Sequence, residues 1–374
     1  MKRPVVIAVV LATTVKLLIA WFTIGTSDIT TWRVFANNAA LCGHCVYALP
    51  GPYGDPFNHP PFLVLFLKLI AGTALFPFWL RLPSILADIG TVFFVSRLLP
   101  NASKWHMVLL ALNPISLLVS GFHGNTDPVM IFFVVTSIYA ITKDRSELAG
   151  LSFGMALNIK IVPVLFVPCF LFHPGIRRRL AFIVAAVAIV SMFFIPYISK
   201  EVIANVLGYQ GLFVNWGLAH YLDLSGRMPL YFLAAPLRYA IIVGSIVLSF
   251  WLSRSGPSLF AICAATVLLF YVLTPSMAMQ YFVWGVPFVI LLGPLRASLY
   301  YGFAGALIAL QYHRWSNGTW YFADSHSVPP VTAQTEFLGF AIWALCAFLL
   351  YSLLRSRHTL QVTGLTSEAV PPQA

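Results

Sequence analysis

Apolar stretches of about 17 to 24 residues recur along the chain, separated by short polar or basic segments. A helix of that length can cross a hydrocarbon layer of roughly 30 Å, where it satisfies its own backbone hydrogen bonds. The pattern predicts an all-α membrane protein, a polytopic bundle of about 10 to 12 transmembrane or re-entrant helices with a long first outer loop. Residues 5–22 lack a small-residue cleavage site and contain Lys16, so we interpret them as a retained helix.

Basic side chains gather at one set of helix ends, which the positive-inside rule assigns to the cytoplasmic side. The clusters are Lys2 with Arg3, Lys143 with Arg145, Arg177 to Arg179, Arg254, Arg296, and Arg355 with Arg357. With these clusters fixed, we expect helices near residues 105–121, 127–142, 178–197, 231–251, 258–275, 281–294, 297–311 and 335–354. The outer face then receives the loops 25–60, 122–127, 199–230, 276–281 and 312–333.

Two stretches do not fit simple alternation of crossings. Residues 60–98 contain two apolar runs where one crossing is required, and residues 149–172 have basic flanks on both sides. We predict broken or re-entrant helices there, the second with a tip near Lys160. The membrane domain is expected to span residues 1–358, and residues 359–374 are expected to form a short disordered cytoplasmic tail.

The composition excludes a water-soluble globular protein. Of the 374 residues, 60% are hydrophobic and only 9% are charged, against roughly a quarter charged in a typical soluble domain. The mean hydropathy is +0.87. A net charge of +11 would suggest nucleic-acid binding in a soluble protein. Here the basic residues cluster at helix ends, so we expect membrane lipids as partners and no nucleic acid.

The long first outer loop carries candidate functional residues. Asp28 lies just beyond the first helix, where it can be interpreted equally as a general base or as an N-cap of the following helix. His59 lies near the end of the loop. Cys42 and Cys45 have the spacing of a redox dithiol, and a local disulfide is one interpretation. A redox or zinc role would need surrounding features that the sequence lacks, and we expect no metal site and no cofactor.

The segment 121–128 interrupts an apolar region with several polar side chains. Asp127 precedes Pro128 and can be explained as the start of a helix. A helix start does not explain His123 or Asn125, which are therefore candidate substrate-binding residues.

Two of the charges inside apolar runs are candidates for a functional role. Lys160 and Asp88 are each a functional hypothesis by default, because a lone charge in a membrane is costly. For Asp88, a polar contact between packed helices is an equally good interpretation.

Five segments, taken in this order, resemble the GT-C glycosyltransferases that use dolichyl- or polyprenyl-phosphate sugars. They are residues 27–36 (SDITTWRVFA), 59–62 (HPPF), 113–127 with its polar end GFHGNTD, 158–163 (NIKIVP) and 280–284 (QYFVW). The second is similar to a step of protein O-mannosyltransferases, and the last resembles a motif of glycosylphosphatidylinositol-type mannosyltransferases. The first segment departs from the Asp-x-Asp that the latter enzymes often show, which puts a divalent metal requirement in doubt.

The resemblance implies an inverting reaction in which Asp28 accepts the proton of the acceptor hydroxyl, with Asp127 as the second candidate base. Lys160, His220 and Arg227 are then the candidates for the leaving phosphate. The other substrate-binding residues that it implies are His59, His123, Asn125, Asp127, Gln280 and Tyr281. Trp216, Trp315 and Trp320 are candidates for stacking on sugars, or for an interfacial aromatic belt.

The implied function is a membrane glycosyltransferase, with mannose as the sugar that the resemblance favours. The expected partners are a polyprenyl- or dolichyl-phosphate sugar donor and a lipid-linked or glycan acceptor on the non-cytoplasmic face. A transporter of lipid-linked sugars is the alternative, although it would more often show repeated halves. We expect a bacterial plasma membrane, or the endoplasmic reticulum if the source is eukaryotic.

Overall fold

The computed structural model describes residues 2–208, 216–224, 230–326 and 331–355, so Arg227 and the expected tail at 359–374 lie outside the described residues. The first half contains α1 (Arg3–Phe22), β1 (Gly25–Thr26), α2 (Ser27–Leu41), α3 (Cys45–Ala48), α4 (Phe62–Ile70), α5 (Phe76–Leu98), α6 (Lys104–Ala111), α7 (Pro114–Leu118), the π-helix η1 (Val119–His123), α8 (Asp127–Thr142), α9 (Ser146–Ile159), η2 (Val162–Phe166) and α10 (Val167–Phe172). The second half contains α11 (Arg179–Phe194), η3 (Ile195–Tyr197), α12 (Lys200–Val202), η4 (Ile203–Leu207), α13 (Leu218–Leu224), α14 (Leu230–Ser255), α15 (Leu259–Leu273), η5 (Met279–Gly285), α16 (Val286–Val289), η6 (Ile290–Leu292), α17 (Pro294–Trp315), β2 (Phe322–Ala323) and α18 (Ala333–Arg355).

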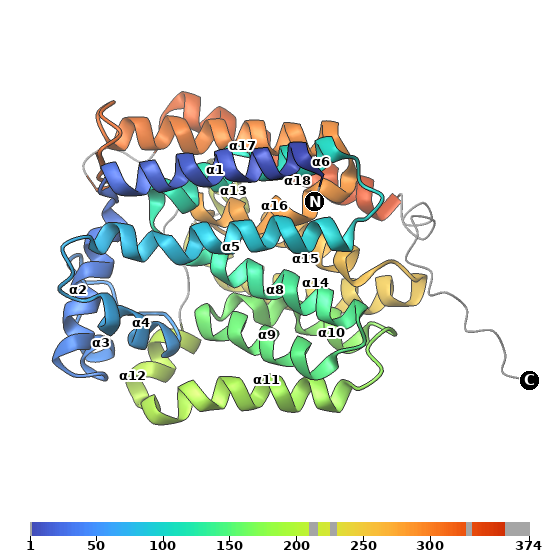
Figure 1. Ribbon diagram of the computed structural model, residues 1–374, viewed down its shortest axis with the longest axis horizontal. Helices are drawn as coiled ribbons and strands as arrows, with labels where there is room; N and C mark the ends of the chain where they lie inside the picture. Colours follow the sequence, from blue (N-terminus) through green and yellow to red (C-terminus); the bar gives the residue numbers. More distant parts are fainter. Residues whose placement is uncertain (1, 209–215, 225–229, 327–330, 356–374) are drawn as a thin grey trace, which may run out of the picture.

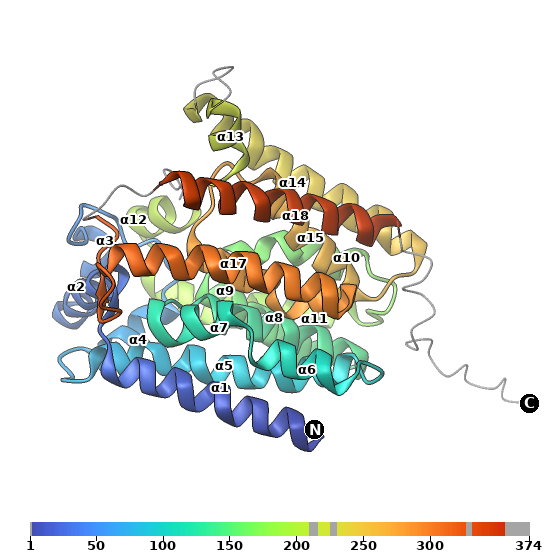
Figure 2. The ribbon, with the colours of Figure 1, turned by 90° about the horizontal axis from the view of Figure 1, so that it is seen from above.

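The long helices lie side by side along the long axis of the molecule, as Figures 1 and 2 show. In the described part of the chain, six helices are long and apolar enough to cross a membrane. They are Arg3–Phe22, Phe76–Leu98, Lys104–His123, Arg179–Tyr197, Pro236–Ser255 and Ala333–Arg355. Shorter apolar helices fill the bundle between them. The predicted all-α polytopic fold is confirmed.

The two ends of the bundle differ in character. The short helices α2, α3, α4 and α12 gather at one end, and the start of α1 and the end of α18 lie toward the other (Figures 1 and 2). The connections that carry Lys143, Arg177, Arg254 and Arg296 also lie at that other end (Figure 1). The basic clusters therefore share one end, as the positive-inside assignment predicts.

Two predicted interruptions of helices are present. The run 60–98 divides into the short α4 and the long α5. α9 ends at Ile159, the backbone of the following Lys160 is extended, and the chain resumes in η2 with Pro163 in its first turn. A proline lacks the backbone donor that a continuous helix would need, so the helix restarts at this point.

The expected helix at 105–121 corresponds to the candidate span Lys104–His123, which the structure subdivides into α6, α7 and η1. Asn113 caps the second piece by accepting a hydrogen bond of 2.8 Å from the backbone amide of Ser116. Pro114 follows at the first helical position, where its missing N–H costs nothing. The π-helix η1 then ends at Gly124, which has a left-handed backbone. This π-helical turn leads directly into the polar segment 121–128, and such turns are frequent at functional sites.

Buried polar side chains fix the position of η1 in the bundle. Arg81 of α5, whose exposed fraction is 0%, donates hydrogen bonds to the carbonyls of Ala20, Thr23 and Gly121. These bonds join the end of α1 to η1. A buried guanidinium is tolerated because its donors are satisfied, so we expect Arg81 to be structural.

A second buried polar group lies deeper in the bundle. The Lys16 ammonium is 2.6 Å from a carboxylate oxygen of Asp88, and the Ser120 hydroxyl donates to the same oxygen. The charged pair therefore links α1, α5 and η1. This geometry favours the packing interpretation of Asp88 over a direct role in chemistry.

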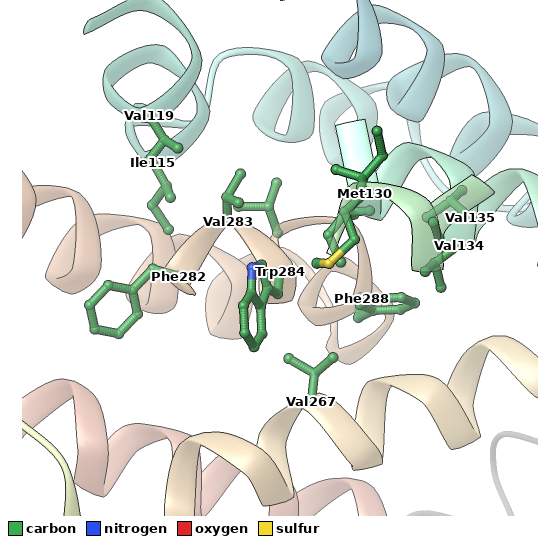
Figure 3. Packing of buried hydrophobic residues seen from close by; sticks show 14 of the residues in the cluster. Ile115, Val119, Met130, Val134, Val135, Val267, Phe282, Val283, Trp284 and Phe288 are labelled. Atoms are coloured by element: carbon green, nitrogen blue, oxygen red, sulfur yellow. The ribbon is translucent and has the colours of Figure 1, made fainter. Parts of the chain in front are cut away.

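A close-packed apolar region lies beneath the end of the bundle that carries α2 to α4. Figure 3 shows side chains of η5 and α16 packed against α7, α8 and α15, with the Trp284 indole at the centre. The labelled residues are Ile115, Val119, Met130, Val134, Val135, Val267, Phe282, Val283, Trp284 and Phe288. Because Trp284 is only 2% exposed, its position and that of η5 are fixed by packing.

The orientation of the bundle can be tested by cysteine labelling. Asp55→Cys, at the end with the short helices, and Lys143→Cys, at the basic end, both replace exposed residues. We expect a membrane-impermeant maleimide to label them from opposite sides of sealed vesicles, with Lys143→Cys reacting only from the cytoplasmic side. Background labelling should be low, because the native cysteines are buried or disulfide-bonded. Labelling of both positions from the same side would contradict this orientation.

Candidate active site

A cavity of about 600 Å³ opens at the end of the bundle that carries α2 to α4. Its walls come from the first outer loop, the end of η1, the break between α9 and η2, the start of η5 and the end of α17. Seven of the predicted site residues line it: Asp28, His59, His123, Asn125, Lys160, Gln280 and Tyr281. Trp216 and Trp315 also line the cavity, as expected for sugar stacking, whereas Trp320 instead contacts the ring of Phe122.

Asp28 lies in the first turn of α2, and its carboxylate accepts a hydrogen bond of 3.0 Å from Nε2 of His123. The N-cap residue of α2 is Thr26, and the structure records no side-chain capping bond at this helix start. The Thr26 hydroxyl instead donates to the backbone carbonyl of His123 at 2.8 Å. The N-cap interpretation of Asp28 is therefore wrong, and its carboxylate is open to the cavity.

A short parallel strand pair holds the chain just before Asp28. Gly25 pairs with Phe322 in β1 and β2, and the hydroxyls of Ser27 and Ser325 are 2.7 Å apart. Gly25 has φ +101°, and a Cβ there would lie 2.3 Å from the carbonyl oxygen of Phe122. Only glycine fits this left-handed, close approach, which brings the start of α2 against the end of η1.

The partner of Asp28 is itself held by a second hydrogen bond. Nδ1 of His123 is 2.5 Å from the hydroxyl of Tyr312 on α17. The two rings stack with centroids 5.5 Å apart and 26° between their planes. Tyr312 is fully buried and His123 is nearly so. Side chains of α17, η1 and α2 thus form one continuous chain of hydrogen bonds, from Tyr312 through His123 to the Asp28 carboxylate.

The electrostatic environment keeps Asp28 ionised. Burial by itself would raise the pKa of the Asp28 carboxyl, but the charge and hydrogen bond of His123, with the charge of Lys160, hold that pKa below its usual value. The group is therefore a carboxylate at neutral and mildly acidic pH. A carboxylate that faces a cavity and is held by a hydrogen bond can act as a general base.

Lys160 and Asp127 form an ion pair in the inner wall of the cavity. The Lys160 ammonium lies 3.0 and 3.1 Å from the two carboxylate oxygens of Asp127, and the indole N–H of Trp284 donates to one of these oxygens. The ammonium also lies 5.2 Å from the ring centroid of Tyr281. Asp127 has an exposed fraction of 0% and does not line the cavity, so it serves as the counter-ion of Lys160.

His59 contributes a neutral ring to the cavity. The centroid of its ring lies 4.7 Å from the ring centroid of Trp32. Its backbone carbonyl accepts a hydrogen bond of 2.8 Å from the Tyr47 hydroxyl. Burial, together with the charge of Lys160, lowers the pKa of His59 to about 3. The imidazole is thus neutral at physiological pH and can hydrogen-bond a sugar hydroxyl, but it offers no positive charge to a phosphate.

One of the residues predicted to bind phosphate does not join this group. His220 of α13 forms hydrogen bonds of 2.9 and 3.1 Å with the carboxylate of Glu336 on α18 and does not line the cavity. Arg227 falls outside the described residues. Lys160 is therefore the predicted phosphate-binding cation that the structure places at the cavity wall.

Sequence reasoning missed the residues that hold the site from behind. Tyr312 lies in a hydrophobic run, where an aromatic residue looks like ordinary packing, and Trp284 is visible only as the last residue of the segment QYFVW, with no role of its own. Arg81 lies near the start of a long apolar helix, where an interfacial anchor is the usual interpretation. An arginine several residues inside an apolar run is the signal that could have identified Arg81.

Cys42 and Cys45 form a disulfide in the loop between α2 and α3. The residues described in the structure contain no group of three or more His, Cys, Asp or Glu side chains that could hold a metal ion. Whether the reaction needs a divalent metal stays a prediction from the sequence.

Comparison with known proteins supports the resemblance. A family model described as Mannosyltransferase (PIG-M) matches residues 119–233. GPI mannosyltransferase 1 of Kluyveromyces lactis is 28% identical over 87 residues, which cover 22% of this chain and 21% of that protein. The similarity to GT-C mannosyltransferases predicted from the sequence is confirmed.

The part of the chain that matches the family model is the part that holds one wall of the cavity. Residues 119–233 include His123, Asn125, Asp127 and Lys160. Asp28 and Gln280 lie outside this match, and the structure brings them to the same cavity. The similarity and the cavity therefore rest on partly independent observations.

Proposed function

We propose that this protein is a mannosyltransferase that acts in the cavity at the end of the bundle opposite the basic clusters. The donor is a polyprenyl- or dolichyl-phosphate mannose, and the acceptor is a hydroxyl of a lipid-linked or glycan substrate. One observation carries the proposal: the ionised Asp28 carboxylate faces a cavity of about 600 Å³. The similarity to mannosyltransferases supports the choice of sugar.

The geometry supports a single inverting displacement. Asp28 accepts the proton of the acceptor hydroxyl while that oxygen forms a bond to the anomeric carbon of mannose. The bond from this carbon to the phosphate oxygen breaks on the opposite side of the ring, and the lipid phosphate leaves with the electron pair. Lys160 lies in the cavity wall, where its ammonium can stabilise the anionic leaving group.

A transporter of lipid-linked sugars finds no support in the comparisons, which match transferases. The cavity opens toward one end of the bundle, which suits chemistry at one membrane surface. We further propose a bacterial plasma membrane as the location, with a polyprenyl phosphate as the carrier lipid, or the endoplasmic reticulum membrane with a dolichyl phosphate if the source is eukaryotic.

The substrate can be identified with purified protein and a panel of radiolabelled donors. The panel would contain mannose, glucose and galactose on polyprenyl phosphate, and mannose on dolichyl phosphate, each with a membrane lipid extract as acceptor. We expect label to move from polyprenyl-phosphate mannose to a new lipid or glycan product. Transfer from another sugar donor alone would overturn the mannose assignment, and absence of transfer from every donor would overturn the enzyme proposal.

A further inference from the structure

The bond between His123 and Asp28 dictates where the imidazole carries its proton. An ionised carboxylate can only accept a hydrogen bond, so the Nε2 atom of His123 must carry hydrogen. In a neutral ring, Nδ1 then has only a lone pair and can only accept. In this neutral tautomer the Tyr312 hydroxyl, 2.5 Å from Nδ1, donates the second bond, whereas in a protonated ring Nδ1–H donates to the Tyr312 oxygen, and in both cases the ring is held by the same two partners.

The surroundings of His123 leave its ring little freedom. Its exposed fraction is 3% and that of Tyr312 is 0%. The Thr26 hydroxyl donates to the backbone carbonyl of His123, and Arg81 donates to the carbonyl of Gly121 two residues earlier. Two hydrogen bonds thus hold the backbone around His123, and the ring of Tyr312 stacks on the imidazole. A rotation of the imidazole would break the bonds to Asp28 and Tyr312 together.

On these grounds we infer that Tyr312 is a positioning residue for the transfer reaction, which orients His123 so that its Nε2–H points at the catalytic carboxylate of Asp28. The inference rests on the proposed function, because it assigns a task within that reaction. Tyr312 touches neither substrate in this scheme and acts through His123. An aligned donor fixes the direction of the carboxylate, and such alignment of a base is a large part of its effect.

Other polar groups also face Asp28 and must be considered in a pH experiment. Lys160, at the break between α9 and η2, lowers the pKa of the Asp28 carboxyl by its charge, and Asn125 does so by a hydrogen bond. Among the described residues, Tyr53, His59, Tyr281 and Tyr312 also interact electrostatically with Asp28. The variants below leave all of these in place except Tyr312.

The first test is Tyr312→Phe in the purified full-length protein. We expect kcat to fall about tenfold, the effect of roughly 1.4 kcal/mol on the barrier, with KM for donor and acceptor nearly unchanged. The rate at acidic pH should change as well. Activity requires ionised Asp28 and is lost as pH falls through its pKa, which His123 lowers. A misaligned His123 lowers the pKa of Asp28 less, so the acidic side of the pH–rate profile (the acid limb) should move to higher pH.

Tyr301→Phe is the matched control. Tyr301 is a buried tyrosine of the same helix whose hydroxyl donates to the carbonyl of Val286 at 2.7 Å. It lies 11 positions before Tyr312, about 16 Å along the helix. Its replacement removes a comparable buried hydrogen bond, and we expect kcat and the acid limb to stay as in the wild type.

A double-mutant cycle separates positioning from packing. His123→Gln keeps a neutral N–H donor near the place of Nε2 but has no acceptor at the place of Nδ1, where the Tyr312 hydroxyl now binds. We therefore expect Tyr312→Phe to change kcat little in the His123→Gln background. If instead the fold-loss from Tyr312→Phe is the same in both backgrounds, Tyr312 has only a packing role. If Tyr312→Phe does not fold, the kcat of His123→Gln is compared with the kcat of His123→Ala. Equal values in these two variants would overturn the inference.

The outcome for Asp28 distinguishes this inference from the proposed function. Loss of activity in Asp28→Asn together with an unchanged acid limb in Tyr312→Phe would overturn the role of Tyr312 alone. Full activity in Asp28→Asn would overturn the base assignment, and the role of Tyr312 with it.

Discussion

Asp28→Asn is expected to lower the rate of mannosyl transfer by at least about 100-fold, since a positioned general base typically contributes 10² to 10⁴ in rate. The amide keeps the size of the side chain and an oxygen that can accept the hydrogen bond from His123. It removes the proton acceptor. Single-turnover transfer measured with saturating donor would report the loss, and thermal unfolding in the same detergent should be nearly unchanged.

The matched control is Asp144→Asn, at an exposed position in the turn between α8 and α9. Its ion pair with Arg177 spans 3.8 Å between largely exposed side chains, so we expect little effect on activity or stability. A transfer rate for Asp28→Asn above about a tenth of the wild-type rate would rule out Asp28 as the base. Asp55, whose side chain also lines the cavity, would then replace Asp127 as the second candidate, because Asp127 is enclosed by Lys160 and Trp284.

The second large effect is expected at the ion pair in the cavity wall. Lys160→Met should lower the free energy of unfolding by about 3 to 5 kcal/mol, because it leaves the Asp127 carboxylate buried with no cation beside it. The double variant Asp127→Asn with Lys160→Met removes both charges and should recover most of that loss. Equilibrium unfolding of the two variants and the wild type gives the comparison.

The affinity of these variants for the donor should not follow their stability. Both variants lack the ammonium, so both should bind the lipid-phosphate donor more weakly than the wild type, even though the double variant is stable. Equal donor affinity in the double variant and the wild type would show that Lys160 is only the structural partner of Asp127. The double variant is essential here, because a destabilised single variant would not separate binding from folding.

The sequence predicts most of the fold because the bilayer imposes simple constraints. The length of the apolar runs indicates helices, and basic clusters indicate their orientation. The break at Lys160 was visible because a charge and a nearby proline interrupt an apolar run. The division of the run 105–121 was missed, although Pro114 was visible, because a proline can also lie inside a kinked membrane helix.

The candidate site could be predicted only as a set of residues. Polar side chains in outer segments identified Asp28, His123 and Lys160, but their pairing depends on how distant segments pack. Nothing in the local sequence shows that Lys160 has Asp127 as its counter-ion. Tyr312 could not be identified at all, since its role comes from a contact with a residue 189 positions away.

The short strand pair of β1 and β2 has a consequence for biosynthesis. Ser27 and Ser325 are 298 positions apart, and Gly25 pairs with Phe322 beside them. During translation the start of α2 emerges early, and it must wait for nearly the whole chain before this pairing can form. Contacts between such distant segments form late, because the intervening chain must first be ordered. A nascent or truncated chain would thus hold Asp28 without its restraints, and activity would begin only when the last outer segment has been inserted.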